Sequence, residues 1–197
     1  MSVTAKDIAD LRAKTGIGMM ECKKALVEAE GNEEKAIEIL RKKGGAKAAK
    51  KAERETNNGI VEAYIHGNGK IGVLVQVLAE TDFVAKNDEF KEFAHDVALH
   101  IAAMAPKYIT KDEVPADEVA KEKAILLEEV KASGKPAEIA EKIVEGRLNK
   151  YFEEYCLLYQ PFVKDPSKTI EDLLNEKISK IGEKIVIARM SRFQIGN

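Results

Sequence analysis

Hydrophobic positions in residues 1–43 recur every three or four residues in three short stretches, which predicts three helices. The breaks between them fall at Gly16-Ile17-Gly18 and at Gly31-Asn32, where one helix ends before the next begins. The expected buried stripes are Ile8 and Leu11, then Cys22, Leu26 and Ala29, then Ala36, Ile37 and Leu40. A unit of about 45 residues is small for independent stability, so we expect it to pack against another part of the chain.

A basic, alanine-rich stretch follows, from Arg41 to Arg54. The cations that precede its first acid, Glu53, are Arg41, Lys42, Lys43, Lys47, Lys50 and Lys51. Gly44-Gly45 predicts a flexible joint with a helical second half. We therefore divide the chain into residues 1–53, an N-terminal helical domain with a basic linker, and residues 54–197, the core domain.

The hydrophobic period changes to two after Asn57-Asn58-Gly59, which predicts a β-hairpin. Its turn is Gly67-Asn68-Gly69, and the alternating positions are Val61, Ala63 and Ile65, then Ile71, Val73, Val75 and Val77. The helical period returns from Asp88 to Ala105, with an expected core face of Phe90, Phe93, Val97, Ile101 and Ala105 beside Ala94, Ala98 and Ala102.

Two further helices around Gly134-Lys135-Pro136 predict a protruding helical hairpin, a coiled coil at about residues 117–158. The expected seam joins Ala120, Ala124, Leu127 and Val130 to Ala140, Ile143, Arg147, Tyr151 and Tyr155. A helix capped by Ser167 then leads to a final strand, in which Ile185, Ile187 and Phe193 share one parity. If that strand joins the hairpin of strands, the class is α+β, with a small antiparallel sheet packed against helices.

The composition argues against several functional classes, namely nucleic-acid binders, disulfide-rich secreted proteins and membrane proteins. The chain has 32 basic and 34 acidic residues, a balance that argues against a dedicated nucleic-acid binder. Two cysteines are too few for a disulfide framework, and no apolar run approaches the ~18 residues of a membrane span. We therefore expect a cytoplasmic protein that is neither exported nor embedded in a membrane.

Candidate chemistry in this sequence is weak. Gly67, Gly69 and Gly72 match a dinucleotide-binding pattern, but a strand follows them where that pattern needs a helix, so a hairpin turn is the better interpretation. No pair among the His and Cys residues has metal-ligand spacing, and no nucleophile signature appears. We expect no metal site, no cofactor and no enzymatic activity of its own.

Three segments leave two interpretations open. The basic stretch could bind RNA phosphates, although it lacks the interleaved aromatics of single-strand binders, and a solvated helical linker is the simpler interpretation. Met19 and Met20 could fill the core or face a partner. In Thr81-Asp82-Phe83-Val84, Phe83 either packs beneath the following helix or stands exposed as an anchor for a partner.

Several motifs, in order along nearly the whole chain, resemble the bacterial elongation factor Ts family. These are LRAKTGIGMMECKKAL at residues 11–26, TDFVAK at 81–86, SGKPAEIAEK at 133–142, VEGR at 144–147 and QPFV at 160–163. The resemblance implies a guanine-nucleotide exchange factor for elongation factor Tu. It also implies an N-terminal domain similar to ubiquitin-associated modules and a coiled-coil hairpin.

The resemblance assigns roles to particular residues. Arg12, Met19 and Met20 would contact the G domain of elongation factor Tu from the N-terminal domain. Asp82 and Phe83, positioned by Thr81 and Val84, would press on the G domain near its Mg²⁺ site, so that GDP is released. His66 would contact the partner from another part of the core.

This sequence departs from the longer family members, which carry two successive core subdomains and an extra C-terminal helical module. A single hairpin unit here bears both Phe83 and His66. The resemblance to the short form implies a homodimer that binds two elongation factor Tu molecules, in which Phe83 and His66 could reach one partner from different subunits. A generic protein-binding adaptor and an RNA-associated factor remain the alternative functions.

Overall fold

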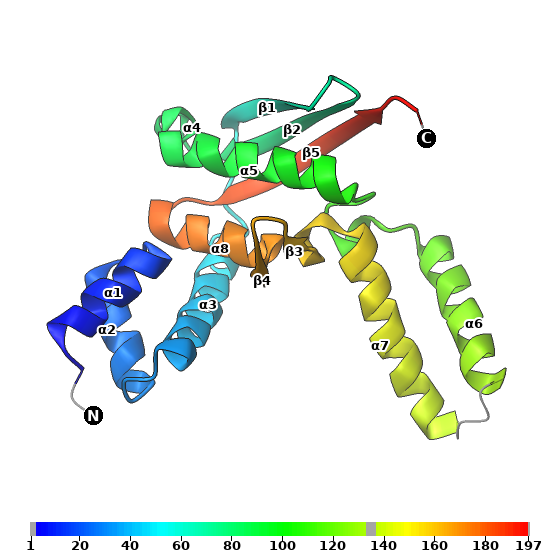
Figure 1. Cartoon of the computed structure of the whole chain (residues 1–197), viewed down its shortest axis with the longest axis horizontal. Coiled ribbons are helices and arrows are strands. Elements are labelled where there is room, and N and C mark those ends of the chain that lie inside the picture. Colours follow the sequence, from blue (N-terminus) through cyan, green and yellow to red (C-terminus); the bar gives the residue numbers. More distant parts are fainter. Residues whose placement is uncertain (1–2, 133–136, 197) are drawn as a thin grey trace.

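The computed structural model describes residues 3–132 and 137–196 of the chain. In chain order the helices and strands are α1 (Ala5–Thr15), α2 (Met19–Glu28), α3 (Glu33–Ala49), β1 (Asn58–His66), β2 (Ile71–Ala79), α4 (Asp82–Lys86), α5 (Asp88–Met104), α6 (Ala116–Ala132), α7 (Ala137–Tyr155), β3 (Pro161–Phe162), β4 (Asp165–Thr169), α8 (Ile170–Ile181) and β5 (Ile185–Gln194). Figure 1 shows a sheet at the top and two helical arms that project away from it, α1 to α3 and α6 with α7. The mixed helix and sheet content agrees with the predicted α+β class.

The N-terminal arm follows the predicted helical pattern. The stripes through Leu11, Cys22 and Leu26 are buried together in one small core. Thr4 caps α1 by accepting a hydrogen bond from the Asp7 amide, and Gly16 ends α1 in the left-handed region at φ 67°. This arm therefore has its own hydrophobic centre.

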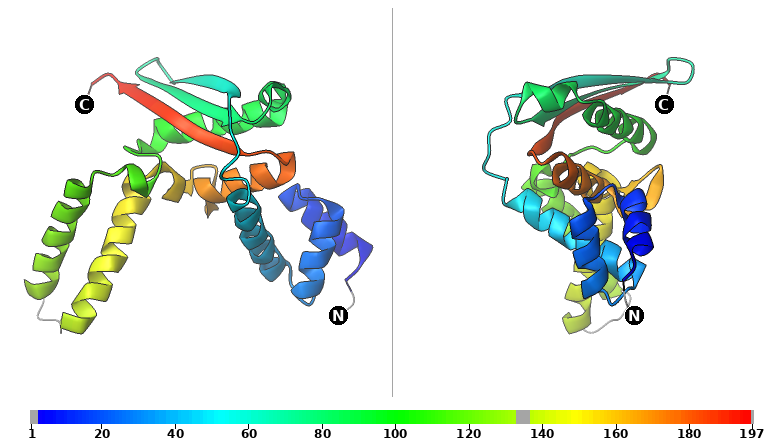
Figure 2. Two further views of the ribbon diagram at one scale, coloured as in Figure 1. Left: turned by 180° about the vertical axis from the view of Figure 1, so that it is seen from behind. Right: turned by 90° about the vertical axis from the view of Figure 1, so that its left-hand side faces the viewer.

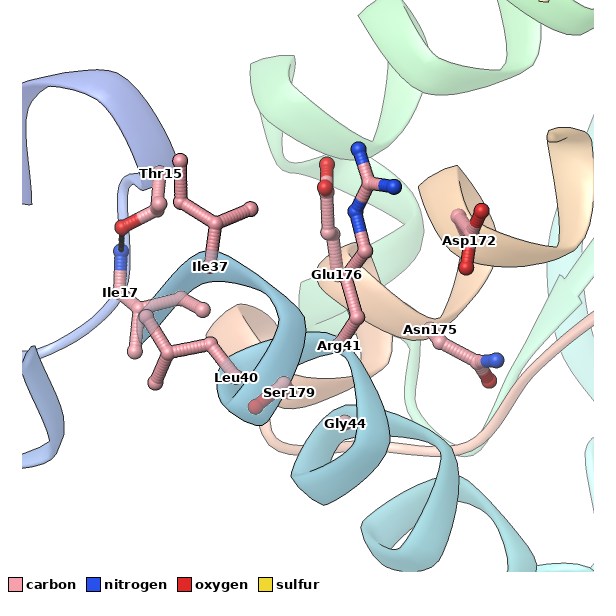
Figure 3. Close-up of a pocket in the computed structure, with 10 residues that line it drawn as sticks. All are labelled: Thr15, Ile17, Ile37, Leu40, Arg41, Gly44, Asp172, Asn175, Glu176 and Ser179. Atoms are coloured by element: carbon pink, nitrogen blue, oxygen red, sulfur yellow. Dashed lines mark hydrogen bonds between the residues drawn. The ribbon is translucent and has the colours of Figure 1, made fainter. Parts of the chain in front are cut away.

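The expected joint at Gly44-Gly45 is wrong, because α3 runs without a break from Glu33 to Ala49. Gly44 is buried where α3 crosses α8, and a Cβ atom at this position would lie 3.6 Å from the Asn175 carbonyl oxygen. Figure 3 shows this crossing, and the guanidinium of Arg41 donates a hydrogen bond to the Ser167 carbonyl at 3.1 Å. Packing against α8 offsets the roughly 1 kcal/mol that glycine costs within a helix.

The sheet has the strand order β1-β2-β5, all antiparallel, so the final strand joins the hairpin as predicted. Its inner face is covered by α5 and α8, whereas Figure 2 shows no helix on the opposite face. The main core consists of Val73, Val75 and Val77 of β2, Phe90, Phe93, Val97 and Ile101 of α5, and Ile170, Leu173 and Ile178 of α8. The Gly67-to-Gly69 segment is the hairpin turn, and both glycines have positive φ.

The prediction that Ile185, Ile187 and Phe193 face the same side of the sheet holds only for the first half of β5. Ile185 and Ile187 are buried, but Phe193 is 69% exposed on the outer face. The register shifts between Gln76 and Val77, where one additional residue, Ala188, is accommodated in β5. A bulge of one residue reverses the face of every side chain beyond it.

Helices α6 and α7 lie side by side in the second arm, as the hairpin prediction requires. The predicted reversal at residues 134–136 lies outside the described residues. The packed seam consists of Leu126, Val130, Ala140 and Val144, with Leu127, Ile143 and Leu148 partly buried. The expected seam positions Ala120 and Ala124 are exposed, so the contact face of α6 is rotated toward Leu126.

The predicted cap of the last helix is also displaced. Ser167 lies within β4, and Thr169 is the N-cap of α8, with a hydrogen bond from the Asp172 amide to its hydroxyl at 3.1 Å. The reciprocal bond runs from the Thr169 amide to the Asp172 carboxylate at 3.1 Å. Thr169 and Asp172 thus form the capping box, which fixes where α8 begins.

A buried polar pair joins α5 to the segment after α7. His100 is fully buried, and its Nε2 lies 3.0 Å from Gln160 Oε1. His100 Nδ1 accepts a hydrogen bond from the Val163 amide at 3.2 Å. Because Nδ1 accepts, Nε2 carries the proton, and the imidazole is neutral. Burial lowers the pKa of His100, although the hydrogen bond with Gln160 opposes this effect.

Candidate partner-binding site

Phe83 lies on the short helix α4, which connects β2 to α5. Its side chain is 82% exposed, so the interpretation that it packs beneath α5 is wrong. The neighbouring Ala85 is buried and Val84 packs against the main core. Helix α4 therefore holds two side chains inward while Phe83 points away from the protein.

Asp82 lies beside Phe83 on the same exposed surface. Its carboxylate forms an ion pair with Lys86, one helical turn later, at 2.7 Å. The hydrogen bond from Lys86 is the main reason that the pKa of Asp82 lies below its usual value. At neutral pH the site presents an apolar ring next to an ionised carboxylate that is paired with an exposed lysine.

Thr81 is the N-cap of α4, and its hydroxyl accepts a hydrogen bond from the Val84 amide at 3.4 Å. The carboxylate of Glu183 binds the same residue from the turn between α8 and β5. Glu183 Oε2 accepts from the Thr81 amide at 3.0 Å, and Oε1 accepts from the Thr81 hydroxyl at 2.7 Å. Thr81 thus has a role in the local fold whether or not it contacts a partner.

The sequence interpretation missed Glu183 and its neighbours. The Lys184 amide donates to Glu80 at 2.5 Å, and the Arg54 guanidinium lies 3.2 Å from the same carboxylate. The Lys184 amide, more than Arg54, holds the pKa of Glu80 below its usual value. Glu183 is 102 residues from Thr81 in sequence, and a glutamate in a turn carries no motif that could have identified the contact.

The predicted N-terminal contact residues are all exposed. Arg12 lies on α1, and Met19 and Met20 at the start of α2 are 45% and 65% exposed. Cys22, Leu26 and Ala29 fill the core of this arm, so neither methionine is needed there. In Figure 1 this arm and α4 lie toward the same end of the molecule.

His66 is not beside Phe83. It ends β1, where it pairs with Ile71, whereas α4 follows the other end of β2. The nine residues of β2 separate the two ends by roughly 26 Å. The exposed imidazole lies 3.0 Å from the Tyr64 hydroxyl. The structure therefore brings Thr81 to Val84 together as one site and places His66 at the opposite end of the sheet.

Residues 3–132 and 137–196 contain no cluster of three or more His, Cys, Asp or Glu side chains that could hold a metal ion. None of the helices in these residues has the length and apolar character needed to cross a bilayer.

Comparison with known proteins gives one consistent result. The profile of the family described as "Elongation factor TS" matches residues 4–197. The elongation factor Ts of Acetivibrio thermocellus is 60% identical over 194 residues, which are 98% of this chain and 90% of that protein. The elongation factor Ts of Fervidobacterium nodosum is 55% identical over 196 residues and the full length of both chains. This chain therefore belongs to the elongation factor Ts family, the nucleotide exchange factors for elongation factor Tu in translation elongation.

Proposed function

We propose that Asp82 and Phe83 of this chain press against the G domain of elongation factor Tu near its Mg²⁺ site. The ring of Phe83 enters an apolar gap and shifts a helix, which disturbs the Mg²⁺ coordination and loosens the phosphates of GDP. The observation that carries the proposal is the 82% exposure of Phe83 on a helix anchored by Val84 and Ala85. An exposed aromatic ring on a fixed support is typical of a binding hot spot.

Phe83 does not act alone. Burial of one phenylalanine stabilises a complex by roughly 1.5–3 kcal/mol, which is too little to expel a tightly held nucleotide. Arg12, Met19 and Met20 supply further contact with the G domain from the N-terminal arm. Their exposure on α1 and α2, at the same end of the molecule as α4, supports one broad interface.

The exchange reaction then follows from linkage. If binding of this chain weakens GDP binding, GDP must weaken binding of this chain by the same free energy. Each ligand displaces the other through a transient ternary complex, and an excess of GTP sets the direction. The chain performs no covalent step, needs no cofactor and acts in the cytoplasm, where elongation factor Tu functions.

Two features of the fold complete the proposal. The N-terminal arm is a three-helix module of the ubiquitin-associated kind, and residues 1–53 form it together with its connection. Helices α6 and α7 form a coiled-coil hairpin within the core domain of residues 54–197. The separate hydrophobic centres of the two arms support this division.

The core domain also forms a homodimer that binds two elongation factor Tu molecules. The outer face of the sheet supports this proposal, because its exposed side chains are unusually apolar for a solvent-facing surface. They are Val61 at 65%, Ile65 at 64%, Leu74 at 48% and Phe193 at 69% exposure. A twofold dimer would cover this face on each subunit with the same face of the other.

The position of His66 fits a dimer better than a single chain. His66 and Phe83 lie at opposite ends of the same sheet, so one subunit would have to span roughly 26 Å to place both on one site. In a twofold dimer, His66 of one subunit and Phe83 of the other can reach the same elongation factor Tu.

An RNA-associated role has less support. Much of the basic stretch is occupied by contacts within the chain: Lys42 pairs with Glu38, Lys43 with Glu28, Lys47 with Glu21, and Arg41 donates to the Ser167 carbonyl. The three lysines that pair with carboxylates release fewer counterions when they meet a phosphate backbone, and the guanidinium of Arg41 is held by a carbonyl of its own chain. We therefore expect no direct binding to nucleic acid, and a filter-binding assay with salt-dependent RNA affinity would contradict this.

The test is release of labelled GDP from preloaded elongation factor Tu. The wild-type chain should accelerate release strongly, and Phe83→Ala should reduce that acceleration by about 10- to 100-fold, since it removes one buried aromatic contact. Ile125→Ala is the matched control, because Ile125 is 52% exposed on the other arm. No acceleration by the wild-type chain would favour a generic adaptor, and equal rates for wild type and Phe83→Ala would overturn the role of Phe83.

A further inference from the structure

The turn between α8 and β5 is bound to the segment that carries Phe83. Gly182 ends α8 in the left-handed region at φ 87°, and Glu183 follows it. Both carboxylate oxygens of Glu183 are used on Thr81: one accepts from its amide at 3.0 Å and the other from its hydroxyl at 2.7 Å. Thr81 is half-buried, so these bonds are partly protected from water.

A second bond runs in the opposite direction. The backbone pairing of β2 with β5 reaches Ala79 and Ile185, and the Lys184 amide then donates to the Glu80 carboxylate at 2.5 Å. Residues 80–81 and 183–184 are thus joined reciprocally just beyond the end of the sheet. The carboxylates of Glu80 and Glu183 continue the hydrogen bonding between β2 and β5 beyond the last backbone pair. These bonds fix the direction in which the chain leaves β2.

This direction determines how α4 is capped. A threonine hydroxyl has one hydrogen and two lone pairs. Because the hydrogen points to Glu183, a lone pair is left to accept from the Val84 amide at 3.4 Å. Helix α4 has only five residues, and a helix of that length has little stability of its own. Its orientation therefore depends on the cap and on the packing of Val84 and Ala85.

We propose that Glu183 is a positioning residue for nucleotide exchange, which holds the Thr81 cap so that Phe83 is presented in one orientation. This inference rests on the proposed function. Glu183 itself does not press on the nucleotide site of the partner. It removes conformational freedom from α4 before the complex forms, so less of the binding energy of Phe83 is lost in ordering the segment.

The experiment is a titration of GDP-loaded elongation factor Tu with each full-length variant, which yields a maximal release rate and a half-saturating concentration. Glu183→Ala should lower the maximal rate about tenfold, the size expected for lost charge-assisted hydrogen bonds. The half-saturating concentration should change less than about twofold, because the N-terminal arm still binds. Thr81→Val should reproduce the effect, and Thr81→Ser, which restores the hydroxyl, should recover most of the rate that Thr81→Val loses. Glu153→Ala removes an exposed carboxylate of α7 and should have no effect.

A double substitution distinguishes the positioning of Phe83 by Glu183 from a general effect of Glu183 on the stability of the fold. In a Phe83→Ala background, Glu183→Ala should cause little further loss of maximal rate, because the ring that it positions is absent. A further tenfold loss in that background would overturn the inference. If Glu183→Ala fails to fold, Glu183→Gln and Thr81→Val carry the same test. The carbonyl oxygen of a glutamine can still accept one hydrogen bond from Thr81, but its amide nitrogen cannot accept the other.

The remaining outcomes distinguish the inference from the proposed function. A wild-type maximal rate for Glu183→Ala, beside a slow Phe83→Ala protein, overturns the inference and leaves the proposed function standing. Equal rates for wild type and Phe83→Ala contradict the role of Phe83 and overturn the inference with it.

Discussion

The hydroxyl of Tyr151 on α7 donates a hydrogen bond to Glu118 Oε1 on α6 at 2.5 Å, which joins the two helices of the second arm near its base. Tyr108 donates to the other oxygen of the same carboxylate at 2.7 Å. The hydrogen bond from Tyr151, followed by that from Tyr108, lowers the pKa of Glu118. One carboxylate thus connects α6, α7 and the segment before α6.

Tyr151→Phe should therefore loosen this arm without unfolding the core. We expect faster amide exchange in α6 and α7 and a Tm lower by a few degrees, because one oxygen of the carboxylate loses its donor. The folded pKa of Glu118 lies below its unfolded value, so this contribution is present above about pH 4.5 and is lost as pH falls through the folded pKa. A wild-type Tm at pH 7 with a difference that appears only in acid would contradict this sign.

Gly59 is needed where β1 pairs with β2, opposite Leu78. A Cβ atom there would collide with the Val77 carbonyl oxygen and lie 2.8 Å from Leu78 Cα, and both are backbone atoms that cannot move aside. Gly59→Ala should cost at least about 2 kcal/mol in the free energy of unfolding, measured by urea denaturation.

Gly146→Ala is the opposite case and serves as the control. Gly146 lies inside α7, and beyond the backbone of its own helix no atom lies within 4 Å of the place that an alanine methyl would take. Alanine therefore gains helix propensity without a clash and should stabilise the arm by roughly 0.5–1 kcal/mol. A destabilised Gly146→Ala, or a neutral Gly59→Ala, would contradict the backbone geometry described for these positions.

His100 should make stability depend on pH between about 7.5 and 5.5. Its folded pKa is lowered by burial, so the unfolded state takes up a proton that the folded state does not. Stability is full above the unfolded pKa of about 6.5 and falls as pH decreases below it, by up to about 1.4 kcal/mol per pH unit. Urea unfolding of wild type and of His100→Asn, across this range, measures the effect.

The non-titrating His100→Asn variant should lose this slope even if it is less stable at every pH. The chosen window lies above the range in which most carboxylates titrate, so their contribution is small. Identical slopes for the two proteins would show that His100 does not titrate differently on unfolding.

The outer face of the sheet should set the oligomeric state. Leu74 lies opposite both Ala63 and Ser191, at the centre of that face. Light scattering of the wild-type chain should give twice the 21.8 kDa of one chain, and Leu74→Lys should give the single mass because it places a charge in the apolar contact.

Ile125→Lys makes the same chemical change at a comparably exposed position on α6 and should leave the mass doubled. A single-chain mass for the wild-type protein would overturn the homodimer.

The period of the hydrophobic positions predicted most of the helices, the β-hairpin and the last strand, because these depend on local patterns. It placed Phe90 correctly in the core, where the side chain is 0% exposed, but left two interpretations open for Phe83, which lies seven residues earlier and is 82% exposed. A short connection contains too few residues to show a hydrophobic period, so the environment of its aromatic residue cannot be predicted from the pattern.

The remaining differences arise from contacts between distant parts of the chain. Packing of α8 on Gly44 keeps α3 continuous, and the additional residue Ala188 turns Phe193 outward. The bonds between Glu183 and Thr81 connect residues 102 positions apart. None of these contacts leaves a local signature in the sequence.

The sheet carries its helices on one side and its exposed apolar residues on the other, and this one-sidedness has a consequence for assembly. Two copies stacked across the open face would leave all four arms directed away from the shared plane (Figure 1). The N-terminal arms, which carry Arg12, Met19 and Met20, would then lie away from the surface used for self-association. A dimer could therefore bind and release both elongation factor Tu molecules without dissociating.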